Sequence, residues 1–319
     1  MPKALITGIS GQDGSNLAEL LVGMGYEVYG IIRRHSVAES QEERIGDLPV
    51  KTYYGDLLDV PSLTRIVSEV MPDEIYNLGA MSHVRVSFDV PSFTIQTNGL
   101  GVLNILEVYR NIRPEAKFYQ ASSSEMFGNS LDEDEYQRES TPMHPVSPYG
   151  CAKLIAYSLV RHYRHAYGLF ACNGILFNHS GPRRTSNFVI PKIVKTACQI
   201  KKGLKQKLEL GNMDSYRDFG DSRDYVRGMY KIISHDIPDD FVIATGQTHC
   251  VRDICEIIFR KLDMDYRDYV EQNAKHMRPE ELKYLRGDAS KAKEVLGWEP
   301  AISFDKMISE MIAHWYKRV

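Results

Sequence analysis

The sequence lacks a strong net charge and any long apolar run. Its 39 basic and 42 acidic residues leave a formal net charge of −3, so no strong field attracts the chain to nucleic acid or to an anionic membrane. No apolar run is long enough to span a bilayer, and the first residues lack the apolar stretch and cleavage site of a signal peptide. We therefore expect a chain that binds neither nucleic acid nor membrane.

Paired cysteines and clustered histidines are also missing. The five cysteines, Cys151, Cys172, Cys198, Cys250 and Cys255, are scattered, odd in number and free of CxxC spacing. This usage is typical of reduced core thiols, so we expect a cytoplasmic protein. The ten histidines show no metal-ligand spacing, and we expect no metal site.

The first half of the chain instead alternates strand-like runs with segments of helical periodicity. This order predicts an α/β fold with a doubly wound parallel (Rossmann) sheet covered by helices on both faces. Helical patterns such as Ser15–Met24 and Tyr149–Tyr167 separate the runs. The predicted strands are Lys3–Gly8, Glu27–Ile32, Val50–Tyr54, Glu74–Asn77, Lys117–Ala121 and Ala171–Phe177.

The pattern changes after Asn178. His179–Asn187 is rich in Gly, Pro, Arg and Ser, which predicts a loop, and Phe241–Ala244 is a later strand-like run that could rejoin the main sheet. We expect a cofactor-binding domain of residues 1–178 plus about 222–248. Residues 179–221 and 249–319 would form a smaller, interleaved α/β lobe that binds substrate.

A glycine-rich turn joins the first predicted strand to the first predicted helix. Gly8, Gly11 and Gly14 are spaced GxxGxxG, with Gln12 and Asp13 between the last two. Such glycines permit a tight turn and a close approach of backbone to a pyrophosphate, which the helix N-terminus then faces. The context favours a dinucleotide site over a glycine-rich turn without ligand.

The ends of the next strands indicate which dinucleotide binds. Arg33 and Arg34 stand where an NAD enzyme usually has a carboxylate, and two guanidinium groups suit a 2′-phosphate, so NADP is favoured over a merely solvated basic pair. Asp56, followed by Leu57, could accept from the adenine amino group, or could instead cap a helix or a turn. Two small or apolar residues after the fourth strand would let the cofactor lie flat: Leu78 and Ala80.

Tyr149 and Lys153 lie four residues apart, which places both on one face of a helix. A free tyrosine titrates too high to act as a base at neutral pH, and a nearby ammonium is expected to lower the pKa of Tyr149. Their position after the fifth strand of a dinucleotide fold favours catalysis over a chance pair on a helix surface.

Glu125 closes the serine-rich end of the fifth predicted strand, two residues after Ser123. A plain alcohol dehydrogenase needs Ser, Tyr and Lys but no carboxylate. Glu125 can remove a carbon-bound proton and return it elsewhere. The alternative is a surface glutamate that caps the following turn.

These motifs together identify a family. The chain resembles the extended short-chain dehydrogenase/reductases and, among them, the GDP-mannose 4,6-dehydratase family, over nearly its whole length. The residues that carry the resemblance occur in the same order along the chain. They are Thr7–Ser15, Glu74–Ala80, Phe118–Gly128, Ser147–Lys153, Leu169–His179 and Gly287–Lys293.

The resemblance implies a hydro-lyase cycle with no net redox change. Tyr149 takes the C4 hydroxyl proton while NADP accepts the C4 hydride, and Lys153 holds the nicotinamide ribose and tunes Tyr149. Glu125 removes the C5 proton, water leaves from C6 with Glu125 or Ser123 assisting, and the hydride returns to C6. Ser123 would bond the C4 oxygen. The product is GDP-4-keto-6-deoxy-D-mannose.

The resemblance also implies further contacts and a homodimer or homotetramer. Cofactor contacts carry over to Tyr149, Lys153, His179 and Arg184. For some of the GDP-sugar contacts the alternative is the solvated face of a charged lobe. The GDP-sugar contacts are Ser82, Asn178, Lys192, Arg217, Arg278 and Glu280.

Some positions depart from the family pattern. Ser180 and Gly181 replace Glu and Ser after His179, Met81 stands where Gln is common, and Phe219 where Trp is common. Met81 and Phe219 could widen tolerance for another GDP-sugar, such as a GDP-heptose. Two rival functions also remain: a sugar-nucleotide 4-ketoreductase or epimerase, for which Glu125 has no use, and a non-catalytic NADP-sensing scaffold, which usually lacks the Tyr or the Lys of the active site.

Overall fold

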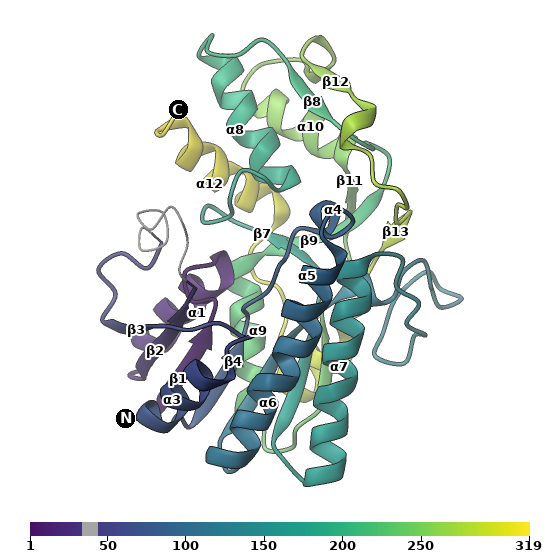
Figure 1. The fold of residues 1–319 in the computed structure, drawn as a ribbon. Helices are drawn as coiled ribbons and strands as arrows, with labels where there is room; N and C mark the ends of the chain where they lie inside the picture. Colours follow the sequence, from purple (N-terminus) through teal and green to yellow (C-terminus); the bar gives the residue numbers. More distant parts are fainter. Residues whose placement is uncertain (34–43) are drawn as a thin grey trace.

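A seven-stranded parallel sheet forms the centre of the larger part of the molecule (Figure 1). The computed structural model describes residues 1–33 and 44–319. The strand order is β10-β6-β5-β4-β1-β2-β3, so the chain winds one way from β1 and the other way from β4, and the predicted Rossmann class is confirmed. The strands are β1 (Lys3–Thr7), β2 (Glu27–Ile32), β3 (Val50–Tyr54), β4 (Glu74–Asn77), β5 (Lys117–Ser123), β6 (Ala171–Leu176) and β10 (Asp240–Ile243).

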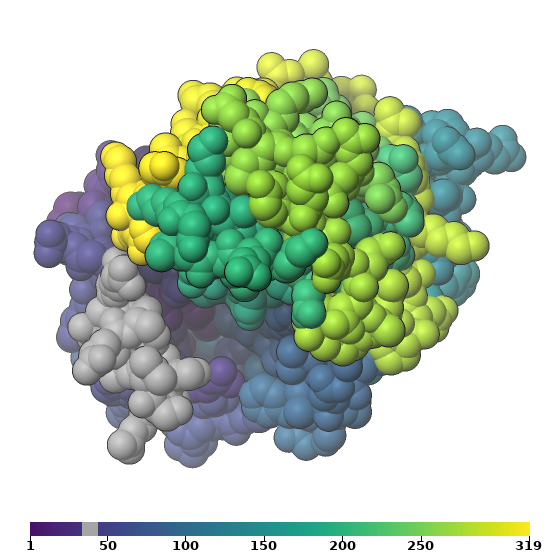
Figure 2. Space-filling view, turned by 90° about the horizontal axis from the view of Figure 1, so that it is seen from above, coloured from purple at the N-terminus to yellow at the C-terminus, as the bar shows by residue number. Residues whose placement is uncertain are grey.

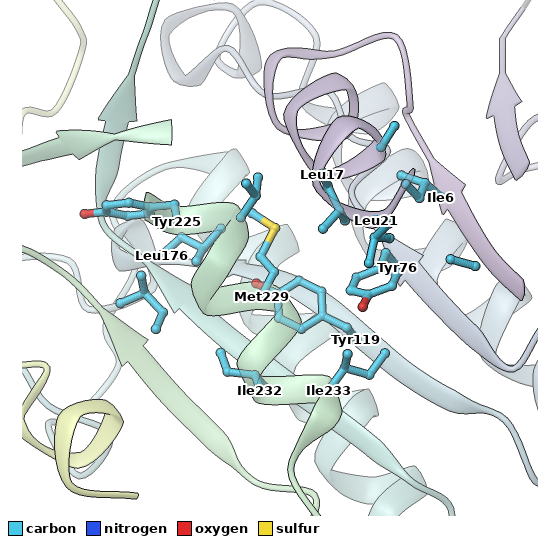
Figure 3. Packing of buried hydrophobic residues seen from close by; sticks show 14 of the residues in the cluster. Ile6, Leu17, Leu21, Tyr76, Tyr119, Leu176, Tyr225, Met229, Ile232 and Ile233 are labelled. Carbon is cyan, nitrogen blue, oxygen red and sulfur yellow. The ribbon is translucent and has the colours of Figure 1, made fainter. Parts of the chain in front are cut away.

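Helices cover both faces of this sheet because successive strand residues point to opposite sides. On one face, Tyr76 and Tyr119 pack against Leu17 of α1 (Gln12–Gly23) and Met229 of α9 (Ser222–Ser234) (Figure 3). On the other face, residues such as Leu5 and Phe118 pack in a second cluster. That cluster also takes in α3 (Val60–Val70), α6 (Gly101–Ile112) and α7 (Pro148–Tyr167).

Three short elements precede α6 and run almost without interruption into it. They are α4 (Val84–Ser87), α5 (Pro91–Ile95) and the π-helical turn η1 (Gln96–Leu100).

The smaller lobe lies above the carboxyl edge of the sheet (Figure 1). Its third cluster of buried side chains lies between helices and two short sheets. In one sheet β9 (Tyr216–Asp221) is flanked by β7 (Asn178–Ser180), β11 (Thr248–Cys250) and β13 (Tyr284–Leu285). In the other, β8 (Leu208–Leu210) pairs with β12 (Val270–Gln272). The helices of this part are α8 (Val189–Lys201), α10 (Val251–Lys261), η3 (Tyr266–Asp268), η4 (Ala274–His276), α11 (Ser290–Leu296) and α12 (Phe304–Tyr316). Helices α8, α10 and α12 pack around the third cluster, whereas α11 lies against α9 and β10.

Two expectations about this half can be compared with the structure. The later strand-like run does rejoin the main sheet, as β10 beside β6. The segment predicted as a loop from His179 is wrong at its start, because residues 178–180 form β7 and pair with β9. A three-residue strand whose partner lies about forty residues later leaves no periodic signal in the sequence.

The described part of the chain, residues 1–33 and 44–319, has no helix that is both long and apolar enough to cross a membrane. Within the same residues, no group of three or more His, Cys, Asp and Glu side chains could hold a metal ion.

Candidate active site

A cavity of about 530 Å³ lies between the carboxyl edge of the large sheet and the smaller lobe. Seen from above, the surface is hollowed between the green lobe and the purple and blue first half of the chain (Figure 2). Open α/β sheets bind ligands in this place, where the strand order reverses. Two walls face each other across it. The sheet wall carries Ser123, Glu125, Tyr149 and Lys153, and the lobe wall carries Lys192, Arg217, Arg278 and Glu281.

The sheet wall is positioned by one helix start and one strand end. α7 begins at Pro148, and the Ser147 hydroxyl caps it by accepting from the Gly150 N–H at 3.0 Å. An added Cβ at Gly150 would lie 2.7 Å from the Glu125 carbonyl oxygen, so only glycine lets α7 approach the turn η2 (Ser124–Met126) this closely. This contact brings Tyr149 beside the end of β5.

Ser123 and Glu125 are fixed by that turn. The Ser123 hydroxyl accepts from the Glu125 N–H at 3.2 Å and opposes the rise in the pKa of Tyr149. The Glu125 side chain is 7% exposed, which rules out a surface glutamate. The capping role that was the alternative for Glu125 belongs to Ser123.

The protonation of Tyr149 and Lys153 is governed by burial. Burial raises the pKa of Tyr149 to about 12, although the Ser123 hydrogen bond and Arg184 oppose the rise. Burial lowers the pKa of Lys153 to about 8, and nearby Asp13 opposes that fall. The expectation that the ammonium lowers the pKa of Tyr149 is therefore wrong for this structure. Lys153 Nζ donates to the Ala121 carbonyl at 2.7 Å and lies 5.8 Å from the centre of the Tyr149 ring.

The lobe wall alternates charges. Arg217 Nη2 pairs with Glu281 at 2.9 Å, Arg278 Nη1 lies 3.3 Å from Glu281, and the same Arg278 atom lies 3.5 Å from Glu125 Oε1. Arg217 is held further by the carbonyl of Leu282. Arg278 thus stands between a carboxylate of each wall.

Glu280 is not part of this wall. It is exposed and does not line the cavity, whereas its neighbour Glu281 does. The segment between η4 and β13 is irregular, so neither strand nor helix periodicity tells which of two adjacent glutamates points inward. The Arg-Pro-Glu-Glu run was the available signal, and the prediction took the wrong member of the pair.

Three other predicted substrate contacts reach the cavity. Ser82, Asn178 and Lys192 all line it, and Lys192 Nζ donates to the Glu209 carbonyl at 2.7 Å. A further cavity residue, His83, was not predicted from the sequence. His83 lines the cavity, faces the Asn187 carbonyl at 3.2 Å and packs on Phe188. Its place directly after Ser82 was the one signal for it.

The glycine-rich loop has the shape expected of a phosphate cradle. Gly8 has φ +69°, and an added Cβ at Gly14 would lie 2.3 Å from the Gly8 carbonyl oxygen, so glycine is required at both positions. The Gly11 N–H donates to the same carbonyl at 2.9 Å, and α1 starts at Gln12. A glycine-rich turn that leads into a helix N-terminus is the usual form of a phosphate-binding site.

Asp13 and two residues from the other half complete this region. His179 and Arg184 line the cavity beside Asp13. Burial opposes ionisation of Asp13, yet His179 and Arg184 outweigh it and lower the pKa of Asp13 to about 2. Arg184 lies over the Phe188 ring at 3.6 Å. The Asp13 carboxylate is therefore ionised and lies close to His179, Arg184 and Lys153.

Only some of the residues predicted to hold the adenosine part of the cofactor line the cavity. Leu78 and Ala80 line the cavity, but Arg33, Asp56 and Leu57 do not. Arg33 is exposed with its guanidinium 5.8 Å from the Phe93 ring, and Arg34 lies outside the described residues. Asp56 Oδ1 accepts from the Leu58 N–H at 2.9 Å, which is the turn role that the sequence left open.

A cofactor with hydroxyl and amide donors fits these residues. The buried oxygens Gln12 Oε1, Asn178 Oδ1 and Ser180 Oγ have no hydrogen-bond partner among the described residues. Buried polar atoms normally find a partner. Together with the glycine cradle, they match a bound dinucleotide and sugar nucleotide.

Comparison with known proteins decides the family. The family model described as "GDP-mannose 4,6 dehydratase" matches residues 5–311. The chain is 46% identical over 321 residues to GDP-mannose 4,6 dehydratase 2 of Arabidopsis thaliana, covering 97% of this chain and 85% of that one. It belongs to the GDP-mannose 4,6-dehydratase family. The human member is 43% identical over 338 residues, with 97% and 90% covered, so the resemblance seen in the motifs is confirmed.

Solved structures agree on the fold of this GDP-mannose 4,6-dehydratase family member. RMD from Pseudomonas aeruginosa, complexed with NADPH, has a TM-score of 0.83 at 24% identity, covering 100% of both chains. dTDP-glucose 4,6-dehydratase from Bacillus anthracis, in complex with NAD, has a TM-score of 0.85 at 23% identity, covering 100% and 97%. At these identities the likeness shows the fold alone.

Proposed function

We propose that this chain is a hydro-lyase that converts GDP-D-mannose to GDP-4-keto-6-deoxy-D-mannose with recycled NADP. The observation that carries this is a buried carboxylate, Glu125, in one cavity with Ser123, Tyr149 and Lys153. Family membership supports the same reaction. Residues 1–178 with 222–248 would hold the cofactor, and the remaining lobe would hold the GDP-sugar.

The chain's own residues would hold NADP from the glycine-rich loop to the sheet wall of the cavity. Gly8, Gly11 and Gly14 would leave room for the pyrophosphate, and Gln12 and Asp13 would flank it. The other cofactor contacts that we propose are Arg33, Arg34, Asp56, Leu57, Leu78, Ala80, His179 and Arg184. When bound, the nicotinamide supplies a hydride acceptor for C4 and returns the hydride to C6.

Four side chains would act on the C4 hydroxyl and the C5 proton. Ser123 would bond the C4 oxygen, and deprotonated Tyr149 would take the proton of the C4 hydroxyl. Burial opposes that deprotonated form, and the positive charges of Lys153 and of a bound oxidised nicotinamide would favour it. Oxidation at C4 makes the C5 proton acidic, and Glu125 removes it. The C6–O bond would break, and the leaving hydroxide would depart as water with the proton that Glu125 took from C5. When the hydride is returned to C6, C5 would take up one proton, which balances the proton that Tyr149 took from the C4 hydroxyl.

The lobe wall would bind the GDP moiety. Arg217, Arg278 and Lys192 bring three cations to one side of the cavity, and guanidinium groups suit phosphate oxygens. Ser82 and Asn178 would contact the sugar and the diphosphate. Phe219 also lines the cavity, and its smaller ring in place of Trp supports testing larger sugars.

The test is incubation of the protein and NADP⁺ with GDP-mannose, a GDP-heptose or dTDP-glucose in separate reactions. The proposal expects loss of one water from GDP-mannose, seen by mass spectrometry, with no net NADPH absorbance. Net accumulation of NADPH would contradict it and indicate a plain dehydrogenase. Turnover of the GDP-heptose alone would keep the chemistry and reassign the sugar.

We also propose a homo-oligomer, a dimer or tetramer, in the cytoplasm. An open, mostly apolar groove of about 520 Å³ lies on the outer side of α7, lined by Leu154, Ile155 and Leu159 among others, and exposed apolar surface of this kind favours association. The five free cysteines support a reducing compartment. Light scattering of Ile155→Lys should report a smaller particle than the unmodified protein gives.

A further inference from the structure

Segments far apart in the sequence are tied together beside the glycine-rich loop. Arg44 Nη1 donates to the Ser10 carbonyl at 3.0 Å, and Arg44 Nε donates to the Arg183 carbonyl at 3.0 Å. Arg183 Nη2 in turn pairs with Glu19 of α1 at 2.5 Å. The connection between β7 and α8 is thereby attached to the loop and to its helix.

A second, inner bond joins the same two segments. His179 Nε2 lies 2.9 Å from Asp13 Oδ2, and His179 Nδ1 lies 2.8 Å from the Phe177 carbonyl. Both ring nitrogens face oxygen acceptors, so the ring is held from two sides. The ring also stacks on Tyr225, with centres 4.4 Å apart. We call the contacts of Asp13, Glu19, Arg44, His179 and Arg183 the clasp.

The clasp has an inner and an outer half. Asp13 and His179 line the cavity, whereas Glu19, Arg44 and Arg183 do not. The outer half therefore holds the two segments together from outside the cavity. None of its three side chains is among the proposed cofactor contacts, so a change there tests how the segments separate apart from those contacts.

We propose that the clasp retains the dinucleotide and must open before the cofactor exchanges. This inference rests on the proposed function, in which the hydride removed from C4 is returned to C6 of the same sugar. Release of the reduced cofactor between these steps would strand the 4-keto sugar without a reductant. A closed connection over the glycine-rich loop prevents that release, and it slows entry and exit together.

Arg44 contributes most to the outer half. It donates two charge-assisted hydrogen bonds to backbone carbonyls, so Arg44→Met should raise the rate of NADPH release about tenfold. The Glu19 side chain is 58% exposed, and exposed ion pairs contribute little, so Glu19→Gln should raise that rate only about twofold.

The experiment is stopped-flow fluorescence of NADPH release from the full-length protein into excess NADP⁺, with no sugar present. Association is measured on the same variants. Arg65→Met is the matched control, because Arg65 also donates to a backbone carbonyl, that of Tyr54, but on an exposed surface. We expect faster association as well as faster release in Arg44→Met, and unchanged rates in Arg65→Met.

Three results would overturn the clasp. Release from Arg44→Met within twofold of the unmodified rate would do so, and so would an equal effect of Arg65→Met. Faster release with unchanged association would mean that Arg44 adds affinity and does not gate exchange. If Arg44→Met does not fold, Arg44→Lys, which keeps the charge but cannot reproduce both hydrogen bonds, is measured against the same limits. Absence of any NADPH binding by the unmodified protein would instead overturn the cofactor assignment, and the clasp with it.

Discussion

The two walls of the cavity are built in different ways. On the sheet wall, Glu125 and Tyr149 are held by a strand end, a capped helix start and the close approach at Gly150. On the lobe wall, Arg278 and Glu281 lie in an irregular segment and are held mainly by ion pairs with one another and with Arg217. Backbone packing fixes the proposed reacting groups, whereas ion pairs between side chains hold the proposed nucleotide contacts. Changes on the first wall should therefore affect chemistry, and changes on the second should affect binding.

The largest expected effect is that of Glu125→Gln on the sheet wall. The amide fills the same space but cannot take the C5 proton, so kcat for dehydration should fall about 10³-fold, within the usual range for a general base. NADPH binding should be unchanged, because Glu125 is not among the proposed cofactor contacts. Product formation is followed by mass spectrometry and cofactor binding by fluorescence.

Glu133→Gln is the control for this variant, since Glu133 is exposed in the following loop. Dehydration and NADPH binding should both be unchanged in Glu133→Gln. Full yield of the 4-keto-6-deoxy product from Glu125→Gln would refute the role of Glu125 and the contrast between the walls.

The sheet wall was largely predictable from the sequence, because its signals are local. The GxxGxxG turn, the four-residue spacing of Tyr149 and Lys153 and the carboxylate after a strand each lie within one or two elements. The inward member of the pair Glu280 and Glu281 depends on the path of an irregular segment. Such a path is set by tertiary contacts, and a single sequence does not carry them.

Ionisation was the other point at which sequence reasoning failed. Spacing places Lys153 on the face of Tyr149, but it gives no measure of how deeply both are buried. In the structure, burial dominates the pKa of each group. The His179–Asp13 pair was equally hidden, because 166 positions separate its members.

On the lobe wall, Arg278→Gln should weaken substrate binding. Arg278 is shared between Glu281 and Glu125, and a diphosphate offers it a stronger partner, so loss of the guanidinium should raise KM about 30-fold. The value of kcat should change only a few-fold. Steady-state kinetics with GDP-mannose separates the two constants.

Lys283→Gln removes one positive charge from the same segment outside the cavity and serves as the control. Its KM should stay within about twofold of the unmodified value, as expected for an exposed charge. A large fall in kcat for Arg278→Gln with little change in KM would place Arg278 in the chemistry and remove the distinction between the walls.

The smallest effect concerns the pH dependence of the sheet wall. Lys153 has a pKa of about 8, lowered by burial and partly restored by Asp13, so it loses its proton as pH rises through 8, and activity should fall on that limb. Asp13→Asn removes the restoring charge, so this limb of the profile of kcat should move to lower pH.

The pH dependence of stability at Lys153 has the opposite sign to that of activity. Between pH 8 and the ordinary lysine value of 10.5, the unfolded chain binds more protons at this site, so Lys153 makes unfolding free energy rise with pH there. Thermal melts at several pH values should show that Lys153→Met flattens this rise in unfolding free energy. If the alkaline limb of the kcat profile does not move in Asp13→Asn, a group other than Lys153 sets that limb.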